Sequence, residues 1–112
     1  ASTCYDKLYP VPDFGKVAGV SLLGSSKDRG TTCFYYRMSD LDAAGVRVLL
    51  EYYAALNGNT FYQFSDGAFT SSAGYMLSVS IIETHYQGVD ALGICVSGIG
   101  SQSVGGLVRV AA

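Results

Sequence analysis

The most regular pattern of hydrophobic and polar positions lies in residues 39–59, SDLDAAGVRVLLEYYAALNGN. Apolar side chains recur there every three or four residues, which is the spacing of one helix face. Ser39 has the side chain of a helix N-cap, and Asn57-Gly58 is a pair that commonly ends a helix. The pattern therefore predicts a helix between these signals, with an apolar face formed by Leu41, Ala44, Val48, Leu49, Tyr52, Ala55 and Leu56.

This predicted helix is apolar around most of its circumference. Val46, Leu50 and Tyr53 lie outside the main apolar face. Arg47 and Glu51 mark the polar edge and have the i,i+4 spacing of a weak ion pair. A helix with this pattern has to be covered on more than one side. We expect the cover to be a neighbouring helix on the same sheet face or a second protein chain.

Alternating and β-branched runs predict the strands. Residues 73–85 give the clearest one, because Tyr75, Leu77, Val79 and Ile81 alternate there with Met76, Ser78, Ser80 and Ile82. Four further strands are expected at 17–24, 31–38, 60–64 and 106–112. The stretches between them at 24–30 and 65–74 are rich in glycine and serine, and they predict a turn and a loop.

Residues 89–99 fit two structures. Asp90 could cap a short helix from Ala91 to Ser97, while the β-branched Ile94 and Val96 also suit a strand. A helix here would produce the split βαβ order of ferredoxin-like folds. A strand here would leave the helix of residues 39–59 more exposed and would favour a partner chain over it.

The helical alternative gives the predicted fold class, which is α+β. It is a two-layer sandwich in which an antiparallel sheet of four or five strands carries two helices on one face. The chain has 112 residues and is expected to form one domain. Residues 1–16 contain both prolines and are expected to be an extended N-terminal arm without a regular core element.

Composition narrows the functional classes. Charged residues make up only 14% of the chain, the net charge is −2, and the seven basic residues are scattered. The sequence therefore has no cluster of basic residues of the kind that binds nucleic acids. The chain begins ASTCYDK, which is typical of a mature, processed N-terminus, so we expect a secreted protein.

The three cysteines fit neither a zinc site nor a CxxC redox pair. Cys4 and Cys33 lie in polar surroundings, whereas Cys95 lies in the apolar run ALGICVSGI. This contrast predicts a disulfide between Cys4 and Cys33. A pair that includes Cys95, or an intermolecular bridge, remains open because spacing alone does not fix connectivity.

Glu83 and His85 are the candidate catalytic residues. They lie two positions apart on the clearest strand, so both can project from the same face, and a histidine held by a carboxylate can act as a general base. No nucleophile motif accompanies the pair. The sequence also predicts no metal site and no cofactor, because its acidic residues and its glycine-rich segment 98–106 lack the required spacings.

Tyrosine is the most distinctive component of the chain, with nine copies. Its amphipathic side chain is enriched at recognition surfaces, and it also occurs buried with its hydroxyl at the rim of a core. We select Tyr35, Tyr53 and Tyr62 as candidate recognition residues.

Three segments carry a resemblance to a known group: the capped helix SDLDAAGVRVLLEYYAAL, the strand GYMLSVSIIE and the apolar run ALGICVSGIG. With the processed start and the proposed sandwich order, the chain resembles the small secreted α/β killer toxins and effectors of yeasts and fungi. The resemblance implies a non-enzymatic toxin that acts at the envelope of a target cell.

The leading hypothesis is therefore a secreted, non-enzymatic toxin- or effector-type protein that binds a target-cell surface component or perturbs the membrane. One alternative is a small secreted hydrolase that uses Glu83 and His85. The other is a self-associating structural protein, in which the wide apolar helix forms a homo-oligomer contact.

Overall fold

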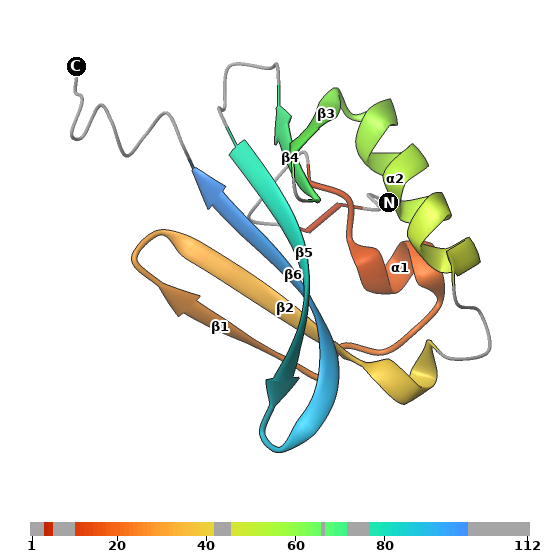
Figure 1. The fold of residues 1–112 in the computed structure, drawn as a ribbon, viewed down its shortest axis with the longest axis vertical. Helices are drawn as coiled ribbons and strands as arrows, with labels where there is room; N and C mark the ends of the chain where they lie inside the picture. The colour runs from red at the N-terminus through yellow and green to blue at the C-terminus, as the bar shows by residue number, and fades with distance from the viewer. Residues whose placement is uncertain (1–3, 6–10, 42–45, 66, 72–76, 99–112) are drawn as a thin grey trace.

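A computed structural model of the chain describes residues 4–5, 11–41, 46–65, 67–71 and 77–98 (Figure 1). These residues form one antiparallel sheet of six strands in the order β1-β2-β6-β5-β4-β3. The strands are β1 (Gly24–Asp28), β2 (Thr31–Arg37), β3 (Phe61–Ser65), β4 (Ala68–Ser71), β5 (Leu77–Tyr86) and β6 (Val89–Gly98). The helices are α1 (Phe14–Ala18), the 3₁₀ turn η1 (Met38–Asp40) and α2 (Val46–Gly58).

The predicted fold class is wrong. In the described part of the chain α2 is the one long helix, since α1 has five residues and η1 has three. Two strands, β1 and β4, also arise within the stretches predicted as a turn and a loop. The predicted strands at 31–38, 60–64 and 73–85 correspond to β2, β3 and β5, and the one at 106–112 lies outside the described residues. No described helix is long and apolar enough to cross a membrane.

The largest error concerns residues 89–99, where β6 replaces the predicted second helix. Strand β6 pairs with β2 on one side and with β5 on the other, so its backbone groups are used from both edges. Its β-branched Ile94 and Val96 are buried in the core. Asp90, the predicted helix cap, lies opposite His85 in the β5–β6 ladder. Pairing with β5 across a tight turn and with β2, which is distant in the sequence, therefore decided a segment that its own periodicity left open.

Two tight hairpins produce four of the six strands of the sheet. Arg29 and Gly30 join β1 to β2, and Gln87 and Gly88 join β5 to β6; all four have positive φ angles. Two consecutive residues of this kind form the two-residue turn whose twist matches the twist of paired strands. The register then follows directly from each turn, with Asp28 opposite Thr31 and Tyr86 opposite Val89.

The N-terminal segment contributes to the core instead of remaining an extended arm. The side chain of Asp13 accepts a hydrogen bond from the backbone N–H of Lys16 and so caps α1, and Gly19 ends the helix with a φ of 75°. This helix starts in the arm predicted for 1–16 and extends into the strand predicted for 17–24, so both predictions fail over Phe14–Ala18. Phe14 is completely buried.

Helix α2 is covered by the sheet on one side and by α1 on another (Figure 1). Its fully buried positions are Val48, Tyr52 and Leu56, three of the residues in the predicted apolar face. The described part of the helix is Val46–Gly58, and Ser39, the predicted N-cap, lies inside the 3₁₀ turn η1. Leu50 remains 58% exposed. The neighbouring helix that covers α2 is therefore α1 and not residues 91–97.

Three buried tyrosine hydroxyls fasten the N-terminal segment in place. The hydroxyl of Tyr5 lies 2.5 Å from that of Tyr36 on β2 and accepts a hydrogen bond from the backbone N–H of Phe14 at 3.1 Å. Tyr52 on α2 donates from its hydroxyl to the carbonyl oxygen of Pro12 at 2.7 Å. The segment is thus bonded to both the sheet and the helix that cover it. Burial raises the pKa of Tyr36 to about 12 and raises the pKa values of Tyr5 and Tyr52 further.

The disulfide joins Cys33 to Cys95, so the predicted bridge between Cys4 and Cys33 is wrong. Cys33 on β2 and Cys95 on β6 are directly opposed in the ladder, with Cα atoms 4.0 Å apart. Cys4 is buried elsewhere, in the N-terminal segment, where its backbone pairs with that of Pro12 in an isolated antiparallel β-bridge. Cys33 and Cys95 can form a disulfide because β6 is a strand that pairs with β2. The apolar residues around Cys95 had instead suggested a buried free thiol.

Alkaline pH is expected to destabilise the fold. Tyr5, Tyr36 and Tyr52 have raised pKa values in the folded chain, whereas in the unfolded chain they ionise near 10.0. The unfolded chain then binds fewer protons above about pH 10, and stability falls by up to about 1.4 kcal/mol per pH unit for each tyrosine. Urea unfolding between about pH 8 and pH 11 measures this slope.

The variant Tyr36→Phe should have a free energy of unfolding about 1 kcal/mol lower than the wild type at neutral pH, and its stability should fall less steeply above about pH 10. An unchanged slope would contradict the buried network of tyrosine hydroxyls.

Removal of the disulfide is expected to lower the free energy of unfolding by about 4 kcal/mol, because it closes a loop with a sequence separation of 62 residues. The double variant Cys33→Ala with Cys95→Ala, measured by urea unfolding, gives this loss. Peptide mapping of the unreduced wild-type protein provides the direct control. It should yield a linked pair that contains Cys33 and Cys95, and a linked pair that contains Cys4 would contradict the structure.

Candidate functional site

The candidate site is the outer face of the sheet, which we define as the face turned away from α1 and α2. Side chains alternate between the two faces of a strand. In β2, Phe34 and Tyr36 join the core with Ile94 and Val96 of β6. The residues between them therefore project from the outer face. The register of the six strands arranges these residues in three rows that run across the sheet.

The first of these, the hydroxyl row, crosses all six strands. It is formed in order by Asp28, Thr31, Ser97, Ser78, Thr70 and Tyr62. Five of its six members carry a hydroxyl group, and the hydroxyls of Thr31 and Ser97 lie 3.2 Å apart within hydrogen-bond distance. Neighbouring strands are about 4.8 Å apart, so the row presents a polar group at nearly constant intervals.

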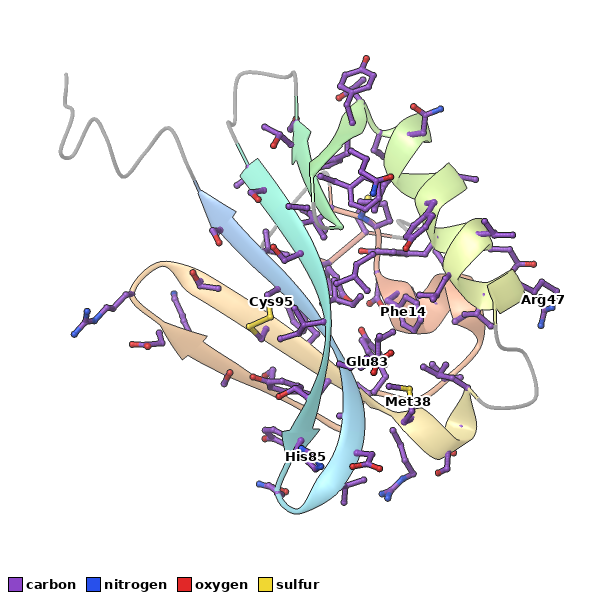
Figure 2. The ribbon with its side chains drawn as sticks, in the orientation of Figure 1. Phe14, Met38, Arg47, Glu83, His85 and Cys95 are labelled. Carbon is purple, nitrogen blue, oxygen red and sulfur yellow. A yellow bond between two sulfur atoms is a disulfide. The ribbon has the colours of Figure 1, made fainter. Side chains whose placement is uncertain are left out.

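The disulfide row lies next to the hydroxyl row. It is formed by Ser26, Cys33, Cys95, Ser80 and Ala68. The bond between Cys33 and Cys95 ties the two central strands of this row together (Figure 2). Ser26 also bonds to the neighbouring row, because its hydroxyl lies 2.9 Å from that of Tyr35. The disulfide holds β2 and β6 in register on the outer face itself.

The glycine–tyrosine row is formed by Gly24, Tyr35, Gly93 and Ile82. The ring of Tyr35 stacks on the ring of Tyr86, with centroids 4.4 Å apart and planes inclined by 16°. The two glycines make room for the stack and for Ile82. A Cβ atom on Gly24 would lie 2.5 Å from the ring of Tyr86, and one on Gly93 would lie 3.0 Å from Ile82. Ile82 is 42% exposed. The result is a low aromatic and aliphatic platform beside the two polar rows.

Charge is sparse on the outer face. Across the three rows, as the described residues form them, Asp28 is the one charged side chain, and it lies on the edge strand β1. Arg37 is exposed on the same face of β2, opposite Ala91, in the position that follows the glycine–tyrosine row. The three rows themselves therefore offer mainly hydroxyl groups and aromatic rings, with one charge at each end of the face.

Two of the predicted recognition tyrosines lie on this face. Tyr35 forms the platform, and Tyr62, which is 55% exposed, ends the hydroxyl row on the edge strand β3. Tyr53 does not join them, because it packs on the core side against Phe69 at a centroid distance of 5.2 Å. The sequence reasoning missed Tyr86, whose position after a clear strand of alternating residues could have placed it on the same face as Ile82.

The candidate catalytic pair is arranged differently from its prediction. Glu83 and His85 lie on β5 (Figure 2), but His85 Nε2 lies 2.7 Å from Oδ1 of Asp90, its cross-strand neighbour on β6. Both partners are 76% exposed, so water competes for this contact. A cavity of about 330 Å³ adjoins the pair and is lined by Met38, Glu83, Thr84, His85 and Asp90. Among the described residues no group of three or more histidine, cysteine or acidic side chains could hold a metal ion.

Comparison with known proteins identifies no relative: no family model, no curated protein and no solved structure matches the chain.

Substitution Gly24→Ala is expected to break the aromatic stack. The added Cβ would overlap the end of the Tyr86 ring, which can swing away because it is a flexible side chain on the surface. The loss should be about 1 kcal/mol or less in stability, together with a change in the near-UV circular dichroism of tyrosine. Gly58→Ala is the matched control, because nothing lies within 4 Å of the added atom. Equal near-UV spectra for wild type and Gly24→Ala would contradict the stacked geometry.

Proposed function

We propose that this chain is a secreted, non-enzymatic recognition protein that binds a component of a target-cell surface through the outer face of its sheet. The observation that carries the proposal is the platform of Tyr35, Tyr86 and Ile82 on the same face as the hydroxyl row and the disulfide row. Tyrosine rings supply contact area and hydroxyl groups supply adaptable hydrogen bonds, a combination found at protein recognition surfaces. The toxin or effector type within this proposal comes from the resemblance of the sequence and not from the fold.

The disulfide supports the extracellular part of the proposal. Disulfides persist in oxidising compartments and are rare in the reducing cytosol. The bond between Cys33 and Cys95 lies in the middle of the sheet, where it links the strands that carry the platform. The small share of charged residues, 14%, also suits a surface that relies on hydroxyl groups for its solubility.

The geometry of His85 favours a binder over the hydrolase alternative. A general base needs a fixed position and a partner that orients it. His85 is held by a single contact with Asp90, and both side chains are largely in water. Such an exposed pair contributes about 0.5 kcal/mol or less and does not fix the ring strongly.

The test is the binding of fluorescently labelled protein to intact cells of several yeasts, filamentous fungi and bacteria. The wild type should bind at least one of them. The double variant Tyr35→Ala with Tyr62→Ala should bind at least about tenfold more weakly, because each truncated aromatic anchor commonly costs more than 1 kcal/mol. His85→Ala should bind like the wild type.

Circular dichroism and thermal unfolding of each variant separate lost binding from lost folding. Two results would contradict the proposal: no binding of the folded wild type to any cell type, or an activity that disappears in the folded His85→Ala variant.

A further inference from the structure

We infer that the ligand of the outer face is an uncharged polysaccharide, with sugar units that lie across the strands along the hydroxyl row and other sugar units that pack on the tyrosine platform. This inference rests on the proposed function and names the chemical class of its ligand.

Charge complementarity is the first argument. A serine or threonine hydroxyl can both donate and accept hydrogen bonds, and the hydroxyl groups of a sugar have the same double capacity. The three rows contain one charged residue, Asp28, and it lies at the edge of the sheet. Arg37 lies on the same face but outside these rows, beyond the platform. A strongly charged ligand along the hydroxyl row would lose strong hydration there, and the one charge that it would meet is Asp28 at the edge. A neutral polyol gives up weaker hydration, and its hydroxyls can replace water as partners of Thr31, Ser97 and Ser78.

The shape of the face is the second argument. The hydroxyl row crosses six strands, which gives a length of about 24 Å at about 4.8 Å per interval. Each hydrogen bond between neutral groups adds only about 1 kcal/mol when it replaces a bond with water. Useful affinity on such a surface therefore requires many repeated contacts. An extended polymer with a hydroxyl-bearing repeat supplies them, whereas a small molecule contacts one or two strands.

The platform is the third argument. The faces of a pyranose ring expose C–H groups and are apolar, so they pack against aromatic rings and aliphatic side chains. Tyr35, Tyr86 and Ile82 form a partly exposed apolar surface of this kind. Gly24 and Gly93 allow the rings to lie low against the sheet. A sugar ring on the platform thus lies next to the disulfide row, where Ser26 and Ser80 can meet its hydroxyls.

The experiment is a sedimentation assay of the intact protein with insoluble neutral polysaccharides, namely β-1,3-glucan, mannan, chitin and cellulose. Anionic alginate beads serve as a comparison. The wild type should be retained by at least one neutral polymer, and its retention should change less than about twofold up to about 1 M salt, because no charge contact is screened. Stronger retention on alginate that is lost in salt would overturn the inference.

Two matched lysine variants locate the site. Ser78→Lys places a long charged side chain in the middle of the hydroxyl row and should weaken retention at least tenfold. Ala54→Lys adds the same charge at an exposed position of α2, away from the outer face, and should leave retention unchanged. Circular dichroism verifies that both variants are folded. Equal retention of the two folded variants would overturn the inference.

Comparison of the cell-binding assay with the sedimentation assay distinguishes failure of this inference from failure of the proposed function. Wild type that binds cells but sediments with none of the neutral polymers overturns the ligand class and leaves surface recognition standing. Wild type that binds neither cells nor polymers overturns both.

Discussion

The buried hydrogen bonds of three tyrosine hydroxyls are the interaction on which the rest of the structure depends. Tyr36 comes from the sheet, Tyr52 from α2 and Tyr5 from the N-terminal segment, and their hydroxyls meet the segment that passes between sheet and helix. A buried polar group without a hydrogen-bond partner would lower the stability by about 1 to 3 kcal/mol. The N-terminal segment therefore has to lie where it gives these hydroxyls their partners. The segment in turn brings Phe14 between Tyr36 and Tyr52, whose ring centroids are 4.9 Å and 5.1 Å away. Helix α2 obtains its second cover in this way, and the core closes on one face of the sheet.

Because the core covers one face of the sheet, the side chains of the other face are available for recognition. The alternation that buries Tyr36, Ile94 and Val79 turns Tyr35, Cys95 and Ser80 outward. The buried inner face of the central strands already specifies their register, because a slip of one residue would turn the apolar side chains outward. The two-residue turns and the bond between Cys33 and Cys95 fix the same register. The rows of hydroxyls, and any ligand they recognise, depend on that register.

The sequence predicted those features that depend on local pattern, and it failed where distant pairing decides. Strand β5 and the apolar face of α2 were predicted because their alternation and helical spacing are strong, and the ion pair between Arg47 and Glu51 forms at 2.8 Å as its spacing indicated. Residues 89–99 were ambiguous because glycine and β-branched residues suit a central strand only when two partner strands are present. The wrong prediction for this segment led to three errors: the fold class, the pairing of Cys4 with Cys33, and the choice of Glu83 in place of Asp90 as the carboxylate beside His85. Tyr35 and Tyr62 were selected by residue type, but the rows that surround them require the register of strands β1 and β4, which the sequence had suggested as a turn and a loop.

The central claim is that the sheet has one buried and one accessible face, each marked by its own tyrosines. Nitration of the folded protein with tetranitromethane, followed by peptide mass spectrometry, tests it directly, because the reagent attacks accessible tyrosines that ionise readily. The account predicts rapid modification of Tyr62, slower modification of Tyr35 and Tyr86, and protection of Tyr5, Tyr36 and Tyr52 until the protein is unfolded. Modification of Tyr36 or Tyr52 in the folded protein at the rate of Tyr62 would contradict it.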